Sequence, residues 1–108
     1  MVNLDLAKVS GIGAWEKELR SGKDDEAPDE IYKIPEGKAF LVLRPKTVEV
    51  RCERNLGRKL QEEYETVMES RYFGRGGVEI VPTGQLDEGE IEDLVRLSYN
   101  LTVEMQEV

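Results

Sequence analysis

The feature that most constrains the fold of this chain is a continuous apolar run, Ala39–Leu43, between two proline-containing segments. A run this short is typical of a central strand that is buried on both faces of a sheet. Residues 35–38 and 44–46 enclose it, and each segment contains a proline, which fixes φ and has no amide proton to donate to a neighbouring strand. We therefore expect a strand at residues 39–43 with a turn on either side.

The segments beyond both turns carry the apolar–polar alternation of strands. Residues 30–34 contain two isoleucines in such a pattern. Residues 47–52 direct two valines and a cysteine to one side, and Glu49 and Arg51 to the other. Two short turns between three strands predict an antiparallel meander. A fourth strand is predicted at residues 78–81, which a proline follows.

Two segments show the spacing of amphipathic helices. In the first, Asn55 is a residue type that caps helices, and apolar residues follow on one face at positions 56, 60, 64 and 67. In the second, Asp87 and Glu90 form a start that is similar to a capping box, and an apolar stripe continues from Ile91 to Met105. Acidic residues crowd the first turns of this second helix, where the helix dipole favours them: Asp87, Glu88, Glu90, Glu92 and Asp93.

The remaining segments carry weaker patterns. Residues 3–9 fit either a short helix or a strand, and residues 14–20 predict one or two helical turns. Residues 21–29 have no large apolar side chain and predict a mobile loop, while residues 68–77, rich in glycine and arginine, predict a second loop. We therefore expect a single α+β domain over residues 1–108, with one twisted antiparallel sheet of about four to five strands and helices packed on it.

The composition argues against catalysis. The chain has no histidine, which is the commonest general base and the commonest metal ligand. Its single cysteine, Cys52, falls on the apolar side of its predicted strand, which favours a buried, inert thiol. We expect a binding protein rather than an enzyme, with no cofactor and no metal. The absence of a leader and of a membrane-spanning apolar run predicts a cytoplasmic protein with no membrane partner.

The distribution of charge singles out one basic segment. The chain carries 15 basic and 23 acidic residues, a net charge of −8, which argues against a general coating of nucleic acid. Residues 44–59 are the exception, with six basic and two acidic residues. Residues 71–75 extend this segment, because arginine beside an aromatic ring suits contacts with bases and phosphates. The candidate nucleic-acid-binding residues, with DNA as the expected partner, are Arg44, Lys46, Arg51, Arg54, Arg58, Lys59, Arg71, Tyr72 and Arg75.

Two other interpretations of the charges stay open. The basic segment also fits an ordinary solvated face, because Glu62 and Glu63 lie one helical turn after Arg58 and Lys59 and balance them. The acidic C-terminal helix suits a basic protein partner. A protein-interaction or adaptor domain is therefore the alternative function.

Several short motifs follow one another in an order that is similar to a known family. They are Leu6-Ala7-Lys8-Val9-Ser10-Gly11, Val50-Arg51-Cys52-Glu53, Leu60-Gln61-Glu62-Glu63-Tyr64, Ser70-Arg71-Tyr72-Phe73, Leu86-Asp87-Glu88-Gly89-Glu90-Ile91 and Ser98-Tyr99-Asn100-Leu101. In this order they resemble the MmcQ/YjbR family, small bacterial proteins usually labelled DNA-binding. The resemblance covers about two thirds of the chain.

The resemblance implies a YjbR-like fold, which is one twisted antiparallel sheet with helices packed on it, and DNA as the partner. The chain also departs from the family pattern. Gly74-Arg75-Gly76-Gly77 stands where the family has Asn-Lys-x-His-Trp, and Arg54 and Glu65 stand where it has prolines. If the His-Trp pair serves the family's function, this chain has lost that function or does something else.

Overall fold

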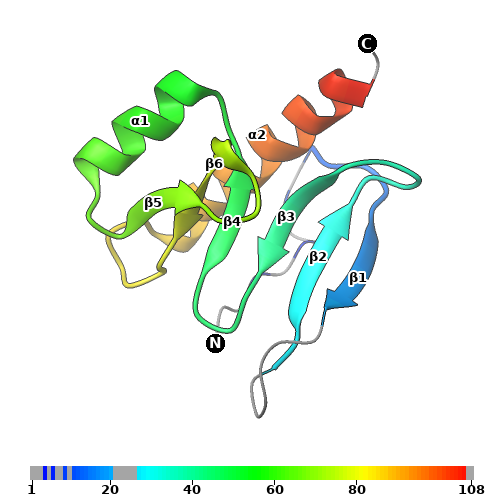
Figure 1. Ribbon diagram of the computed structural model, residues 1–108, viewed down its shortest axis with the longest axis horizontal. Coiled ribbons are helices and arrows are strands. Elements are labelled where there is room, and N and C mark those ends of the chain that lie inside the picture. Colours follow the sequence, from blue (N-terminus) through cyan, green and yellow to red (C-terminus); the bar gives the residue numbers. More distant parts are fainter. Residues whose placement is uncertain (1–3, 5, 7–8, 10, 21–26, 107–108) are drawn as a thin grey trace.

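The computed structural model describes residues 4, 6, 9, 11–20 and 27–106. Within this part of the chain, six strands form one antiparallel sheet and two helices pack on it (Figure 1). The expectation of an α+β fold with one antiparallel sheet is confirmed, but the sheet has six strands rather than the four to five expected. The element predicted at residues 3–9 lies largely outside the described residues, as does most of the loop predicted at residues 21–29.

The strands lie side by side in the order β1-β2-β3-β4-β6-β5, and each neighbouring pair is antiparallel. Their bounds are β1 (Glu16–Arg20), β2 (Asp29–Lys33), β3 (Ala39–Leu43), β4 (Val48–Arg51), β5 (Val67–Ser70) and β6 (Gly74–Ile80). The predicted meander is confirmed as β2, β3 and β4, and β3 has the bounds that its apolar run indicated. The chain then passes through a helix to the far edge of the sheet and returns as β6 between β4 and β5 (Figure 1).

The prediction of helical turns over residues 14–20 is wrong, because most of this segment forms strand β1. Its residues are good helix formers, so the local preference favours a helix. Pairing with β2 over five consecutive residues overrides that preference. Lys17 forms an ion pair with Glu30 of β2 at 3.5 Å, and the Trp15 ring meets the Tyr32 ring edge to face at 5.2 Å.

The prediction of a loop over residues 68–77 is also wrong, since most of these residues belong to the β5–β6 hairpin. The glycines that indicated a loop instead allow β6 to pack closely. A Cβ atom at Gly77 would lie 2.5 Å from the carbonyl oxygen of Val50 and 2.7 Å from the Cβ atom of Phe73. Glycine is therefore required where β4 and the β5–β6 turn approach this strand.

The two helices follow their predictions to different degrees. Helix α1 (Arg54–Glu63) begins before the predicted cap, Asn55, and its N-cap residue Glu53 makes no side-chain capping hydrogen bond. It ends at Glu63, so position 67 belongs to β5 rather than to the helical stripe. Helix α2 (Glu88–Gln106) begins as predicted, because Asp87 Oδ1 accepts a hydrogen bond from the amide of Glu90 at 2.8 Å. Neither α1 nor α2, the helices of the described part, could span a membrane.

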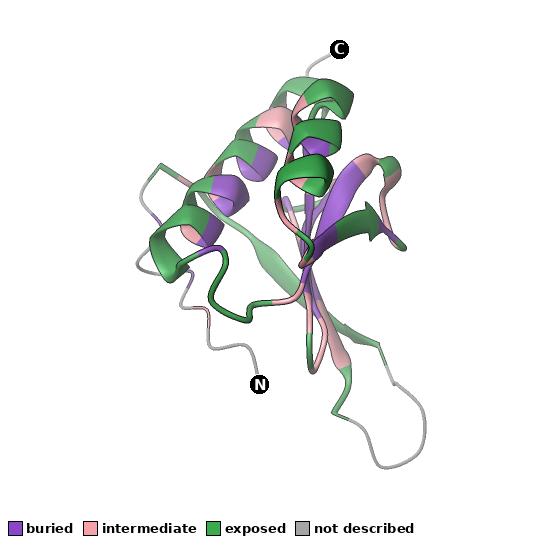
Figure 2. Ribbon diagram, turned by 90° about the vertical axis from the view of Figure 1, so that its left-hand side faces the viewer, coloured by how far each residue is buried: buried purple, intermediate pink, exposed green. Residues whose placement is uncertain are grey.

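Both helices cover the same face of the sheet, and the main hydrophobic core lies between them and the strands (Figure 2). Helix α2 packs on β3 and β4, and α1 packs on β5 and β6. Ser98 fixes α2 to the sheet, since its hydroxyl donates to the carbonyl oxygen of Phe40 at 2.6 Å and accepts from the amide of Arg51 at 2.8 Å. On the opposite face, which we call the outer face, Tyr72 and Phe73 of the β5–β6 turn pack on a smaller cluster from β2 and β3.

Candidate functional site

The outer face of the sheet holds two buried carboxylates. Glu49 of β4 and Glu79 of β6 are direct cross-strand neighbours, and their exposed fractions are only 0% and 3%. A buried carboxylate is costly unless charged or polar donors surround it. The groups that compensate these two carboxylates include several of the predicted binding residues.

Glu49 accepts hydrogen bonds from three residues. Arg44 donates from Nε to one carboxylate oxygen of Glu49. Ser70 Oγ and the amide of Tyr72 donate to the other oxygen, at 2.7 and 2.9 Å. Arg44 also forms an ion pair with Asp29 at 2.7 Å. Glu49 therefore neutralises Arg44 and also fixes the β5–β6 turn to the sheet.

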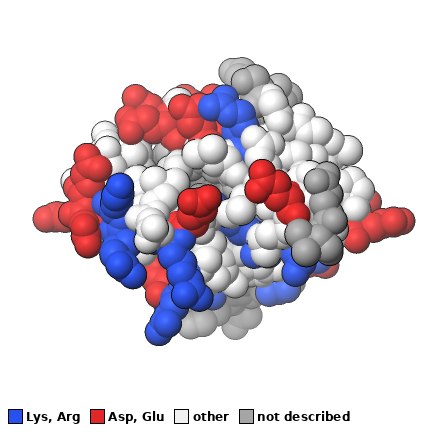
Figure 3. Space-filling model, turned by 90° about the horizontal axis from the view of Figure 1, so that it is seen from above, with Lys and Arg blue, Asp and Glu red and all other residues white. Residues whose placement is uncertain are grey.

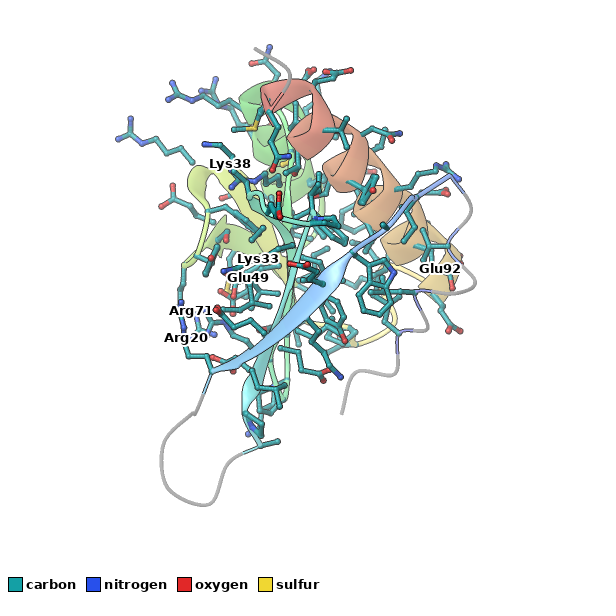
Figure 4. The ribbon with its side chains drawn as sticks, turned by 90° about the vertical axis from the view of Figure 1, so that its right-hand side faces the viewer. Arg20, Lys33, Lys38, Glu49, Arg71 and Glu92 are labelled. Carbon is teal, nitrogen blue, oxygen red and sulfur yellow. The ribbon has the colours of Figure 1, made fainter. Side chains whose placement is uncertain are left out.

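Glu79 is compensated in a similar way. Arg71 donates to it from two nitrogens, at 2.9 and 2.7 Å, and Thr47 Oγ1 donates at 2.8 Å. Burial raises the pKa of Glu79, but the hydrogen bonds from Arg71 and Thr47 and the charge of Arg71 outweigh burial and hold this pKa below its usual value. The hydrogen bond to Glu79 in turn raises the pKa of Arg71. Figure 4 shows Arg71 and Glu49 together on this side of the molecule.

Arg51 and Tyr72 belong to a row of planar side chains on the outer face. The guanidinium carbon of Arg51 lies 4.7 Å from the centre of the Phe73 ring, and its Nε donates to the carbonyl oxygen of Ala39 at 2.8 Å. Burial lowers the pKa of Arg51. The rings of Phe73 and Tyr72 meet edge to face at 4.9 Å, and the guanidinium carbon of Arg20 lies 5.9 Å from the centre of the Tyr72 ring. We call these four residues the stacking row: Arg20, Tyr72, Phe73 and Arg51.

Two members of this row, Arg20 and Phe73, are not among the residues predicted from the sequence to bind nucleic acid. Residues 16–20 predict a helical turn because four of the five are charged and no apolar–polar alternation indicates a strand, so the sequence gives no signal that places Arg20 in this row. Phe73 lies between the predicted Tyr72 and Arg75, so its position beside arginines was the available signal.

Three other predicted residues converge at a hollow between α1 and the β5–β6 hairpin. Arg54 and Arg58 are four residues apart on α1 and so face the same side, and Arg75 comes from β6. The hollow has a volume of about 420 Å³. We call it the arginine hollow, and its other lining residues are Gly57, Gln61, Glu62 and Glu69.

The arginine hollow combines three cationic side chains with the start of a helix. Among the described residues, no carboxylate forms an ion pair with Arg54, Arg58 or Arg75. The first turn of α1 has no acidic residue and its N-cap residue, Glu53, makes no side-chain capping hydrogen bond, so only the charge of Glu53 offsets the positive end of the helix dipole. Glu62 and Glu69 also line the hollow and limit its positive charge.

The predicted basic segment does not form one continuous surface. Arg44 and Arg71 contact internal carboxylates, and three arginines line the hollow. Lys46 is exposed in the β3–β4 turn, and Lys59 is exposed on α1 without lining the hollow. The view of one end of the molecule in Figure 3 shows the same intermixing, because basic and acidic groups alternate across it.

Cys52 and the acidic start of α2 are the other candidate sites among the titratable groups. Cys52 is buried, as the alternation of its segment predicted. Burial raises the pKa of its thiol, and the negative charge of Glu53 raises it further. Within the part of the chain that the structure describes, no group of cysteine and acidic side chains could hold a metal ion. Four acidic residues near the start of α2 line a second hollow of about 350 Å³ with Arg96. One of them, Glu92, lies on the helix side of the molecule (Figure 4).

Known proteins give no further guidance on this site. No family model, no curated protein and no solved structure matches the chain. The resemblance to the MmcQ/YjbR family therefore stays a prediction, and the function has to be inferred from the geometry and charge of the residues themselves.

Proposed function

We propose that this chain is a non-enzymatic binding module that holds phosphate groups of a nucleic acid, with DNA as the first candidate, in the arginine hollow. The observation that carries the proposal is the convergence of Arg54, Arg58 and Arg75, none of which forms an ion pair with a described residue. The YjbR-like character suggested by the sequence motifs leads to the same partner.

Arginine is suited to this role. Its planar guanidinium donates two parallel hydrogen bonds to a phosphate and stays charged under all physiological conditions. Arg54, the first residue of α1, lines the hollow, so the start of this helix lies beside it. Because Glu62 and Glu69 oppose the three arginines, we expect moderate, salt-sensitive affinity rather than tight binding.

The direct test is a fluorescence-anisotropy titration of labelled single- and double-stranded DNA at low salt, with Arg58→Glu and Lys59→Glu as a matched pair. Both changes reverse one charge on the exposed side of α1, but only Arg58 lines the hollow. We expect Arg58→Glu to weaken binding about tenfold or more and Lys59→Glu to have a much smaller effect.

Two results would contradict the proposal. The wild-type chain would fail to bind DNA even at low salt, or Lys59→Glu would weaken binding as much as Arg58→Glu does. The second result would mean that DNA binding depends on the total charge of α1 and not on the residues that line the hollow.

The second candidate function is an adaptor that receives a basic protein segment at the start of α2. The acidic hollow there supports it, since Asp87, Glu90, Glu92 and Asp93 lie together with one arginine among them. A lysine-rich peptide should then bind the chain and lose affinity on Glu92→Lys. If this peptide binds and DNA does not, the adaptor function replaces the nucleic-acid function.

A further inference from the structure

The stacking row joins strands that are far apart in the sequence. Arg20 comes from β1 at one edge of the sheet, Tyr72 and Phe73 come from the β5–β6 turn, and Arg51 comes from β4. Each of the two rings has a guanidinium beside it, and the two rings touch each other edge to face. The result is a continuous row of planar groups across the outer face, on the opposite side of the sheet from the helices.

The arginines of this row are not used by internal carboxylates. Among the described residues, neither Arg20 nor Arg51 forms an ion pair, whereas Arg44 and Arg71 on the same face both do. Neither arginine of the row compensates the buried acids Glu49 and Glu79, which accept from Arg44 and Arg71, although the backbone amide of Tyr72 also donates to Glu49. Within the described residues, the outer face therefore keeps two arginines that lie beside aromatic rings and form no ion pair.

The row and the arginine hollow are connected through the same short turn. Glu49 accepts hydrogen bonds from Ser70 Oγ and from the amide of Tyr72, and Ser70 Oγ accepts one from the amide of Phe73 at 2.8 Å. These contacts fix the aromatic rings to the sheet just before Arg75, which lines the hollow. The aromatic rings of the row and Arg75 of the hollow are therefore separated by only two to three positions in the chain.

We infer that the ligand of this module is a single-stranded nucleic acid, whose bases stack on the row of Arg20, Tyr72, Phe73 and Arg51 while its phosphates lie in the arginine hollow. This inference rests on the proposed function. Aromatic rings and guanidinium planes both stack on unpaired bases, and the stacking tolerates any base sequence. A duplex keeps its bases stacked on one another, so it offers its phosphates to the hollow but no base to the row.

The test compares three labelled ligands of equal length by anisotropy: a single-stranded oligonucleotide, its duplex, and an abasic strand that keeps the sugar-phosphate backbone without bases. We expect the single strand to bind about tenfold more tightly than the abasic strand, because stacking adds to the phosphate contacts only where bases are present. The duplex should bind no more tightly than the abasic strand.

Two substitutions test whether the residues of the row cause the tighter binding of the single strand. Tyr72→Leu removes the ring but keeps the backbone amide that Glu49 holds, and Arg20→Gln removes an exposed cation at the end of the row. Each should reduce the advantage of the single strand over the abasic strand severalfold and leave binding of the abasic strand unchanged. Lys17→Gln is the control for Arg20→Gln, since it removes the same charge from the same strand on its other side.

The outcomes separate the two proposals. If the single strand and the abasic strand bind equally, or if Tyr72→Leu and Arg20→Gln leave their difference intact, stacking on the row is wrong while phosphate binding in the hollow stands. If none of the three ligands binds, the proposed function itself is wrong. Thermal unfolding of each variant, compared with wild type, shows whether a loss of affinity reflects unfolding. Arg20 is exposed, so Arg20→Gln tests stacking on the row even if Tyr72→Leu destabilises the turn.

Discussion

Arg54 occupies the position on α1 where a positive charge is least favourable. It is the first residue of the helix, beside amides that make the helix start electropositive. Helix α2 shows the usual arrangement, in which Asp87 caps the first turn and Glu88 and Glu90 follow it. A residue that breaks a local rule in this way is more often found at a functional site than elsewhere.

This local conflict gives a prediction for Arg54→Glu. The substitution should raise the free energy of unfolding by about 0.3–1 kcal/mol, because an acidic residue suits the start of a helix, and it should weaken binding of DNA. Chemical denaturation and anisotropy on the same samples measure both effects. A variant that is less stable than wild type, or that is more stable but binds as well, would contradict the role given to Arg54.

The buried acid Glu79 makes a prediction about pH. Its pKa in the folded chain lies below its usual value of 4.5, so the folded state binds its proton more weakly than the unfolded state does. Glu79 therefore stabilises the fold above its usual pKa, and this contribution is lost as the pH falls through the lower pKa of the folded state. Denaturant unfolding as a function of pH should show this loss in wild type and a smaller loss in Glu79→Gln.

The matched control for this experiment is Glu65→Gln. Glu65 is exposed and forms no ion pair with any other described residue. The Glu65→Gln substitution should leave the acid-induced loss of stability nearly as large as in wild type. If Glu79→Gln and Glu65→Gln have equal effects, the pairing of Glu79 with Arg71 contributes nothing special to stability.

At the scale of elements, strand β6 differs most from what its composition suggests. Three glycines in seven residues are unusual for an inner strand, because glycine loses more conformational freedom on folding than other residues. The close approach of Val50 and Phe73 to Gly77 explains one of them. That approach brings β4 and the β5–β6 turn into the arrangement on which both proposed binding surfaces depend.

A pair of adjacent alanine substitutions tests this packing. Gly77→Ala should destabilise the fold by about 2 kcal/mol or more, since its Cβ would stand 2.5 Å from a backbone oxygen that cannot move independently of β4. Gly76→Ala should be neutral or slightly stabilising, because its nearest contact would be an ordinary 3.5 Å. Thermal denaturation of both variants is sufficient, and similar losses of stability at both positions would contradict the packing described for β6.

At the scale of the whole molecule, the net charge of −8 should repel a polyanion. The proposed binding is compatible with this charge only if the charges near the binding site determine the affinity. Charges separated by more than about 10 Å are largely screened at 0.1 M salt. The acidic hollow lies at the start of α2, whereas the three arginines meet in a separate hollow between α1 and the β5–β6 hairpin. Binding should therefore depend on the hollow and not on the net charge.

The salt dependence of binding tests this view. If three arginines contact phosphates, a plot of log Kobs against log salt concentration should have a slope of about −2 to −3 for DNA. Arg75→Gln should reduce the magnitude of the slope by about 1, whereas Lys46→Gln should not change it. A wild-type slope near zero would mean that phosphate contacts do not carry the binding.

The sequence by itself determined the elements whose patterns are strong over their whole length. The run at 39–43 fixed a central strand because only burial on both faces suits five apolar residues in a row. The stripe and cap at residues 87–105 likewise fixed α2. Both patterns are local, so they can be recognised without knowing what surrounds the segment.

Only the tertiary structure decided which basic residues are available for binding. Arg44 and Arg71 looked equivalent to Arg54 and Arg58 in the sequence, but neighbouring strands bring the first two against buried carboxylates. The same pairing made residues 16–20 a strand against their helix preference. Cross-strand contacts join residues at any separation along the chain, and their energies exceed the local preferences. For that reason, the division of the basic segment among internal ion pairs, the stacking row and the arginine hollow could not be predicted from the sequence.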